Sequence, residues 1–206
     1  LFLSNGHICP IWYTTLAHAG YLPKKEMLSS LRKLGTRLQG HPHRTSLPGL
    51  ETTSGPLGSG LSQSVGMAIA FKMDGSTSSP QAANRQVICL MSDGEQEAGN
   101  IWEAAMLAGK HRLDNLTGLI DRNNIQIDGM TEDIMPLEPL RAKYEAFNWN
   151  VIEIDGHNFE QISEAVDEAK AISYQPTMII AHTIPGKGVD FMEGKFEWHG
   201  KPPKPG

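Results

Sequence analysis

Two short apolar runs, each ending in oxygen-bearing side chains, constrain this chain more than any other feature. The run over residues 87–91 leads into Asp93, and the run over 116–120 leads into Asn123. Residues 101–108 between them have helical character, so the pattern predicts a strand–helix–strand unit with two buried, parallel strands. Ligands of an open parallel sheet bind at the carboxyl ends of its strands. We therefore expect Asp93 and Asn123 to lie side by side at a ligand site.

In the rest of the chain, segments with helical periodicity alternate with strand-like apolar segments in the same way. They predict helices over 10–19, 24–34, 61–72, 136–147 and 159–171, and further strands over 150–154 and 176–181. The second of these helices is expected to bury Met27, Leu28, Leu31 and Leu34. Residues 40–60 and 74–84 read as loops, and the length of the first favours a functional role. This alternation predicts an α/β fold, a parallel sheet with helices on both faces, in one domain over residues 1–206.

Composition excludes several classes of function. The net charge of −5 gives no support for nucleic-acid binding. No apolar run reaches the roughly 18 residues that span a membrane, and we see no signal peptide. Cys9 and Cys89 lack a metal-binding spacing. A disulfide between them is the alternative, and a cytoplasmic protein with free cysteines is the simpler expectation. The start at Leu1 suggests processing or a missing upstream segment, and residues 200–206 read as a proline-rich tail.

The residue types at the two strand ends suit a hard cation. About thirty positions separate Asp93 from Asn123, the length of one strand–helix–strand crossover. One carboxylate and one amide oxygen suit Mg²⁺, with Ca²⁺ as the alternative, and do not suit zinc. A backbone carbonyl near Ile125, two diphosphate oxygens and a water would complete six ligands, and Gly94 would let the diphosphate approach the backbone. Taken singly, each motif is better interpreted as an ordinary polar turn after a strand. The combination of strand placement and spacing favours a bridged cation and diphosphate.

A glycine-rich loop precedes the helix predicted at 61–72. Gly55, Gly58 and Gly60 would expose backbone N–H groups to an anionic ligand. The alternative is a simple helix entry in which small residues allow close packing.

Together these segments resemble the transketolase-type thiamine diphosphate enzymes. The matching segments, in family order, are residues 2–7, Gly40-His41-Pro42, residues 52–60, Asp93-Gly94-Glu95, residues 123–129 and His199-Gly200-Lys201-Pro202. The resemblance implies metal ligands at Asp93, Asn123 and the Ile125 carbonyl. It implies cofactor contacts from His7, Gly55, Pro56, Leu57, Gly94, Glu95, Asn123 and His199. It implies substrate or catalytic roles for His7, His41 and His199, because imidazole titrates near working pH.

The implied activity is transfer of a two-carbon ketol unit between phosphosugars in the pentose phosphate pathway. Thiamine diphosphate would supply the carbon nucleophile, and Mg²⁺ would anchor it. The element Gly55-Pro56-Leu57-Gly58 favours transketolase over deoxyxylulose-phosphate synthase. That synthase, a 2-oxo acid dehydrogenase component and a degenerate scaffold domain remain the alternatives.

The resemblance also implies a partner chain. The family activates its cofactor with a glutamate from a pyrimidine-binding domain, which nothing in this sequence resembles. We therefore expect the N-terminal subunit of a split transketolase, inactive alone and assembled as α2β2 with a C-terminal subunit. Replacing Asp93 by Ala is expected to abolish metal-dependent cofactor binding with the fold largely intact.

Some positions depart from the family pattern. Ser92 stands where Gly is usual, His43 where Glu is usual, and Glu97 precedes Ala98 where the family has its Glu one position later. This shift places in doubt the role that the family's Glu has across its subunit interface. Single histidines at 18, 111 and 157 read as ordinary loop or surface residues, and His182 is left open.

Overall fold

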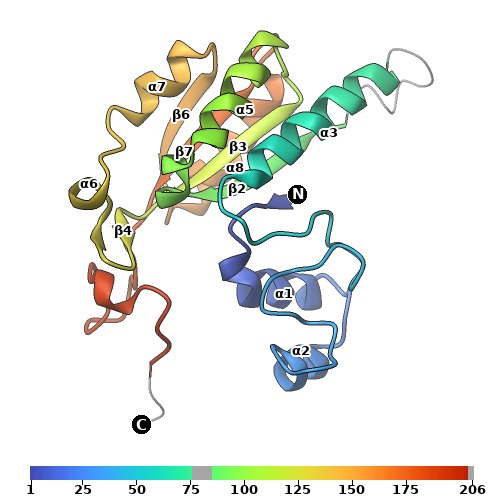
Figure 1. Ribbon diagram of the computed structural model, residues 1–206, viewed down its shortest axis with the longest axis vertical. Coiled ribbons are helices and arrows are strands. Elements are labelled where there is room, and N and C mark those ends of the chain that lie inside the picture. Colours follow the sequence, from blue (N-terminus) through green and yellow to red (C-terminus); the bar gives the residue numbers. More distant parts are fainter. Residues whose placement is uncertain (76–84, 204–206) are drawn as a thin grey trace.

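A parallel sheet forms the centre of the computed structural model, which describes residues 1–75 and 85–203 (Figure 1). In this described part, five strands run in the order β1-β2-β3-β7-β6, and every neighbouring pair is parallel. The strands are β1 (Phe2–Leu3), β2 (Val87–Ser92), β3 (Leu116–Arg122), β7 (Thr177–His182) and β6 (Asn150–Asp155). The predicted α/β fold with a parallel sheet is confirmed.

The register of the two apolar strands places their ends together. β2 pairs with β3 so that Ser92 lies opposite Asp121, and Asp93 and Asn123 follow within two residues. The strands are buried because helices cover the sheet, which explains their continuous apolar sequence. The expected adjacency of the two strand ends is therefore confirmed.

Helices cover both faces of the sheet (Figure 1). The largest apolar cluster joins β2 and β3 to three helices on one face: α3 (Ser59–Gly75), α5 (Gly99–Lys110) and α7 (Leu140–Ala146). A second cluster packs α8 (Phe159–Ala171) against β6 and β7 on the opposite face. The predicted bounds of α8 match the structure, since Asn158 caps it by accepting bonds from the N–H groups of Glu160 and Gln161.

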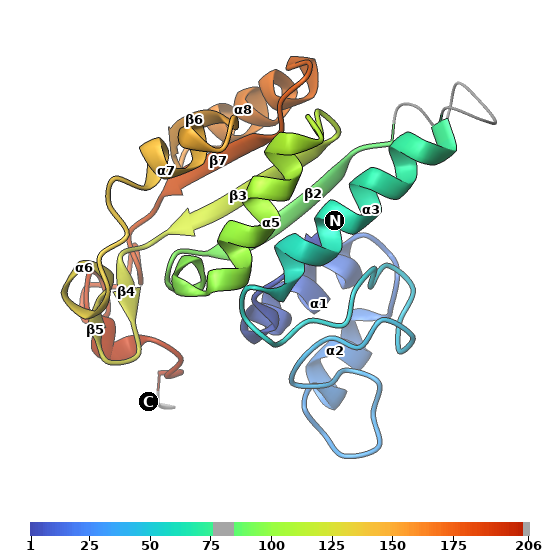
Figure 2. The ribbon, with the colours of Figure 1, turned by 45° about the horizontal axis from the view of Figure 1, so that its top comes forward.

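Two smaller units flank the carboxyl ends of the strands (Figure 2). One contains α1 (Cys9–His18), α2 (Lys24–Ser30) and the loop over 31–58, with its own core around Tyr13 and Leu38. The other contains the hairpin β4 (Ile125–Gln126) and β5 (Gly129–Met130), the helix α6 (Thr131–Ile134) and the C-terminal segment. Short 3₁₀ turns lie at η1 (Gly6–Ile8), η2 (Gly94–Glu97) and η3 (Phe196–Trp198).

The helix expected at 24–34 is shorter than predicted. It ends at Ser30, because Leu31 is extended and Arg32 adopts a left-handed conformation (φ 57°). The Arg32 N–H donates to the Leu38 carbonyl at 2.8 Å, which turns the chain back on itself. Leu28 and Leu34, expected on the buried face, are 78% and 105% exposed; Met27 and Leu31 are partly buried against the core of this unit.

The helix expected at 136–147 begins only at Leu140. Pro136 and Pro139 explain the difference, because a proline disfavours helical backbone at the residue before it. The loop expected at 74–84 is also corrected in part, since α3 extends to Gly75; residues 76–84 lie outside the described residues, as do residues 204–206 of the expected tail.

Within the described residues, none of the helices combines the length and apolarity that crossing a membrane requires.

Candidate functional site

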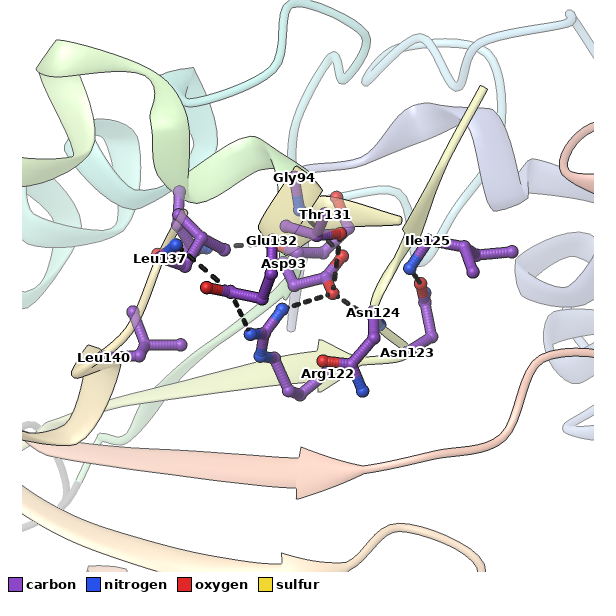
Figure 3. Close-up of polar contacts among 12 residues, drawn as sticks. Asp93, Gly94, Arg122, Asn123, Asn124, Ile125, Thr131, Glu132, Leu137 and Leu140 are labelled. Atoms are coloured by element: carbon purple, nitrogen blue, oxygen red, sulfur yellow. Dashed lines mark hydrogen bonds and ion pairs between the residues drawn. The ribbon is translucent and has the colours of Figure 1, made fainter. Parts of the chain in front are cut away.

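Asp93 lies at the carboxyl end of β2, and its side chain is 2% exposed. Its Oδ1 accepts a bond from the Gly94 N–H at 2.7 Å. Its Oδ2 accepts bonds from the Asn124 N–H at 2.7 Å, Arg122 Nη1 at 3.0 Å and Thr131 Oγ1 at 3.4 Å (Figure 3). Burial raises the pKa of this carboxyl, and the donors around it oppose that rise.

Asn123 follows β3 and shapes the loop that comes next. Its Oδ1 accepts a bond from the Ile125 N–H at 3.0 Å, and its Nδ2 donates to Asp121 Oδ2 at 2.9 Å. The β4–β5 hairpin then returns the chain, and the Thr131 N–H donates to the Asn124 carbonyl at 2.9 Å. The structure thus brings Asp93 next to the segment holding Asn123 and Ile125, as the sequence predicted.

The donor chemistry of these residues fits a hard cation. Asp93, Asn123 and the Ile125 carbonyl offer one carboxylate, one amide and one backbone oxygen, the ligand types of Mg²⁺ and Ca²⁺. In Figure 3 Arg122 and Glu132 lie on one side of the Asp93 carboxylate, and Asn123 and Ile125 lie on the other. No group of three or more His, Cys, Asp or Glu side chains arranged for a metal ion occurs in the described part of the chain.

Arg122 is a residue of this site that the sequence analysis missed. Its side chain is 2% exposed and pairs with three carboxylates: Asp93 at 3.0 Å, Glu132 at 2.5 Å and Glu138 at 3.0 Å. The only signal in the sequence was a charged residue at the end of an apolar strand, directly before Asn123. Its partners could not be found from the sequence, because Glu132 and Glu138 lie beyond the hairpin.

Glu95 lies beneath the glycine-rich loop and is 1% exposed. Its carboxylate accepts bonds from the hydroxyl of Ser4, the N–H of Gly58 at 2.6 Å and the N–H of Ser92 at 3.2 Å. These bonds tie together the end of β1, the glycine-rich loop and the end of β2. Burial raises the pKa of Glu95, and the three donors oppose that rise. The contacts identify Glu95 as a support of the loop.

The glycine-rich loop needs its glycines. Gly55 has a φ of +146°, and a Cβ there would meet the His41 ring at 3.2 Å. Gly58 has a φ of +84°, and a Cβ there would lie 2.3 Å from Asn100 Oδ1. Pro56 and Leu57 at the tip are exposed, with Leu57 at 45%. The tip of the loop at Pro56 and Leu57 is therefore exposed to solvent, whereas Gly55 and Gly58 on either side are closely packed.

Two of the histidines singled out in the sequence, His7 and His41, are in contact, and His199 influences His7 electrostatically. The rings of His7 and His41 meet edge to face, with centroids 4.9 Å apart. Desolvation lowers the pKa of His7, and the charges of His41, His199 and Arg32 lower it further. All three histidines are exposed. Arg32 is a second basic residue that the sequence analysis did not select.

The positions that depart from the family pattern have local partners. Gln126 Nε2 donates to Glu97 Oε1, and the Ala98 Cβ lies 2.7 Å from where a Cβ on Gly58 would be. His43 Nδ1 and the Thr45 hydroxyl are 3.0 Å apart. His182, whose role the sequence left open, has its Nε2 2.8 Å from Glu153 Oε2 in an exposed contact between β7 and β6.

Comparison with known proteins identifies the family. The family model described as "Transketolase, thiamine diphosphate binding domain" matches residues 1–205. A 6-deoxy-6-sulfo-D-fructose transketolase subunit from Clostridium sp. (strain MSTE9) is 45% identical over 199 residues, which cover 97% of this chain and 70% of that protein. An apulose-4-phosphate transketolase subunit from Phocaeicola vulgatus is 42% identical over 197 residues, 96% of this chain and 67% of that protein.

A solved structure agrees with these relatives. The transketolase of Campylobacter jejuni superposes with a TM-score of 0.88 at 35% identity, covering 96% of this chain and 31% of that one. The chain therefore belongs to the family of transketolase thiamine diphosphate-binding domains.

Proposed function

We propose that the chain is one subunit of a two-chain transketolase, which transfers a two-carbon ketol unit between phosphosugars with thiamine diphosphate and Mg²⁺. The observation that carries this proposal is the meeting of Asp93 with the Asn123–Ile125 segment at the ends of two adjacent strands. Family membership supports the assignment of thiamine diphosphate as the cofactor. The oxygen donors at the strand ends support the assignment of Mg²⁺ as the metal.

Each part of the site has a role in this proposal. Asp93, Asn123 and the Ile125 carbonyl hold Mg²⁺, and Gly94 lies next to Asp93 where the diphosphate approaches. Gly55, Pro56 and Leu57 contact the cofactor from the glycine-rich loop, which Glu95 fixes from below. When bound, thiamine diphosphate supplies the carbon nucleophile of the reaction.

The histidine cluster acts on the substrate. The pKa of His7 is lowered, so its imidazole stays neutral at neutral pH and accepts or donates hydrogen bonds without a fixed charge. The rings of His7 and His41 are in contact, and the charge of His199 acts on His7. We therefore assign His41 and His199 to proton exchange with sugar hydroxyls. Arg32 adds a positive charge to the cluster. Such a site suits anionic sugars, and the two named relatives act on a sulfonated sugar and a sugar phosphate.

A partner chain completes the enzyme. Both named relatives are called subunits, and this chain spans 70% and 67% of their lengths. Leu57 and the histidine cluster are exposed, and a pyrimidine-binding subunit would cover them and supply the activating glutamate. We propose an α2β2 assembly in which this chain alone is inactive.

Co-expression with the C-terminal subunit tests this function. The assembled pair is expected to transfer a ketol unit from a ketose phosphate to an aldose phosphate, and the isolated chain is expected to show no transfer. His41→Ala should reduce the rate at least about 100-fold if His41 moves a proton. His18→Ala, an exposed histidine at the end of α1, is the control and should leave the rate unchanged.

Three results would overturn the proposal. Turnover of pyruvate without ketose phosphates would place the enzyme with the deoxyxylulose-phosphate synthases or the 2-oxo acid dehydrogenases. Robust ketol transfer by the isolated chain would show that activity does not need a partner chain. Absence of thiamine diphosphate binding by the assembled pair would indicate a scaffold.

A further inference from the structure

We propose that Arg122 is a positioning residue that fixes the Asp93 carboxylate for Mg²⁺ and so favours Mg²⁺ over Ca²⁺. This inference rests on the proposed function, since it assumes a cation at Asp93. The relationship that carries it is a buried guanidinium shared by the metal ligand and two carboxylates from a later segment (Figure 3).

The charged side chain of Arg122 is buried, so the reason for its burial has to be explained. The side chain is 2% exposed, and arginine is almost never this buried unless it is paired. A buried ion pair is a weak source of net stability, because desolvation offsets much of the attraction. The geometric effect of this network is therefore the better explanation for its presence.

The two terminal nitrogens of Arg122 have different partners. Nη1 donates to Asp93 Oδ2 at 3.0 Å. Nη2 donates to Glu132 Oε1 at 2.5 Å and to Glu138 Oε1 at 3.0 Å. The guanidinium is planar and its donors form a rigid fork. Holding Nη2 from the later segment therefore sets the direction in which Nη1 points at Asp93.

The effect on Asp93 is to fix one oxygen and leave the other available. Oδ2 accepts from Arg122, Asn124 and Thr131, so the carboxylate cannot rotate freely. Oδ1 accepts only the Gly94 N–H among the hydrogen bonds that the described residues give it. A cation at this site would meet an oxygen whose position is determined by the protein.

The two glutamates are themselves held in place. Glu132 Oε1 accepts from the Leu137 N–H at 3.1 Å, and Glu138 Oε2 accepts from the Leu140 N–H at 2.9 Å. Glu132 lies in α6, directly after the hairpin that begins at Ile125. The network therefore ties residues on both sides of the β4–β5 hairpin, Arg122 before it and Glu132 after it, to Asp93 at the end of β2.

Fixed geometry distinguishes the two cations. Mg²⁺ demands near-ideal octahedral geometry at about 2.0–2.1 Å, whereas Ca²⁺ accepts flexible shells at about 2.3–2.6 Å. If the Asp93 carboxylate is held less firmly, the affinity for Mg²⁺ should therefore fall more than the affinity for Ca²⁺. A general loss of structure would lower the affinities for both cations by the same factor.

Arg122→Lys in the assembled two-chain complex tests this role. Lysine keeps the positive charge but lacks the fork that bridges Asp93 to the glutamates. The Kd of thiamine diphosphate would be measured by calorimetry in saturating Mg²⁺ and again in Ca²⁺. We expect the Mg²⁺-supported affinity to fall about 10–100-fold, as for other groups that orient a metal ligand, and the Ca²⁺-supported affinity to fall less. The control is Arg141→Lys, an exposed arginine on α7 paired with Glu145 and Glu153, which should change neither.

Other results have distinct meanings. An equal loss with both metals, or no loss, overturns the positioning role while leaving the proposed function standing. Failure of the wild-type complex to bind the cofactor with either metal overturns the proposed function itself. If Arg122→Lys does not fold, the double variant Glu132→Ala, Glu138→Ala serves instead. It removes both acceptors of Arg122 Nη2, and both side chains are partly exposed. It should shift the preference in the same direction, and an unchanged preference would overturn the inference.

Discussion

Glu95 supports Gly58: its Oε1 accepts a hydrogen bond from the Gly58 N–H at 2.6 Å, and the residue is only 1% exposed. The residue that follows Asp93-Gly94 thus holds the glycine-rich loop, 37 positions earlier in the chain. Because Oε2 also accepts the Ser92 N–H, both carboxylate oxygens face backbone donors.

Glu95→Gln is expected to destabilise the chain by about 1–3 kcal/mol. An amide has one oxygen, so its NH₂ group would face one of the two backbone N–H groups and leave it unsatisfied. Chemical denaturation measures the free energy of unfolding. Glu103→Gln, on the exposed side of α5, is the control and should stay within about 0.5 kcal/mol of the wild type. Equal stability of the two variants would contradict the support assigned to Glu95.

Gly58→Ala and Gly20→Ala separate backbone strain from steric overlap. Both glycines have nearly the same left-handed φ, +84° and +86°, which costs a residue with a Cβ about 1–2 kcal/mol. A Cβ on Gly20 meets no atom within 4 Å, whereas one on Gly58 lies 2.3 Å from Asn100 Oδ1. Gly58→Ala should therefore lose about 1–3 kcal/mol more in the free energy of unfolding. Equal losses would show that the loop relaxes at no cost.

The pKa of His7 provides a test of the histidine cluster. Desolvation lowers it, and the charges of His41, His199 and Arg32 add to the effect. Because a lowered pKa means that the folded chain binds fewer protons, this group's contribution to stability is lost as the pH falls from about 6.5 through the lowered value. NMR titration should place His7 below 6.5, and His199→Ala should raise its pKa. His18→Ala serves as the control and should leave it unchanged. No rise in His199→Ala would separate His199 from the cluster.

Local patterns predicted the sheet and the position of the site well. Strands β2 and β3 are long apolar runs, and their order follows from one crossover, so the sequence alone was enough to place Asp93 and Asn123 together. The bounds of α8 were predicted from its apolar periodicity, and the structure adds a cap at Asn158. These features depend on neighbours in the sequence.

Features that depend on distant contacts could not be predicted. The end of α2 depends on the bond from Arg32 to Leu38, which a leucine spacing does not reveal. The pairing of Arg122 with Glu132 and Glu138 depends on how the β4–β5 hairpin returns. The link between Glu95 and Ser4 spans 91 positions, so its supporting role emerged only from the structure.

The Asp93–Arg122 pair changes one expectation drawn from the sequence. Asp93→Ala was expected to leave the fold largely intact, yet it would leave Arg122 buried with one carboxylate fewer. Removing one partner of a buried pair costs about 3–5 kcal/mol, and Glu132 and Glu138 place this case at the lower end. Asp167→Ala breaks an exposed pair with Lys170 and should cost no more than about 1 kcal/mol. Comparable unfolding free energies for the two variants would contradict the importance of the buried pair.

The central claim is that the Asp93–Asn123 unit holds a cation bridged to a diphosphate. Calorimetric titration of thiamine diphosphate into the assembled two-chain complex, first with EDTA and then with excess Mg²⁺, tests it most directly. We predict no measurable binding with EDTA, full binding once Mg²⁺ is added, and loss of this Mg²⁺ dependence in Asn123→Ala. Equal affinity with and without Mg²⁺ would contradict the account.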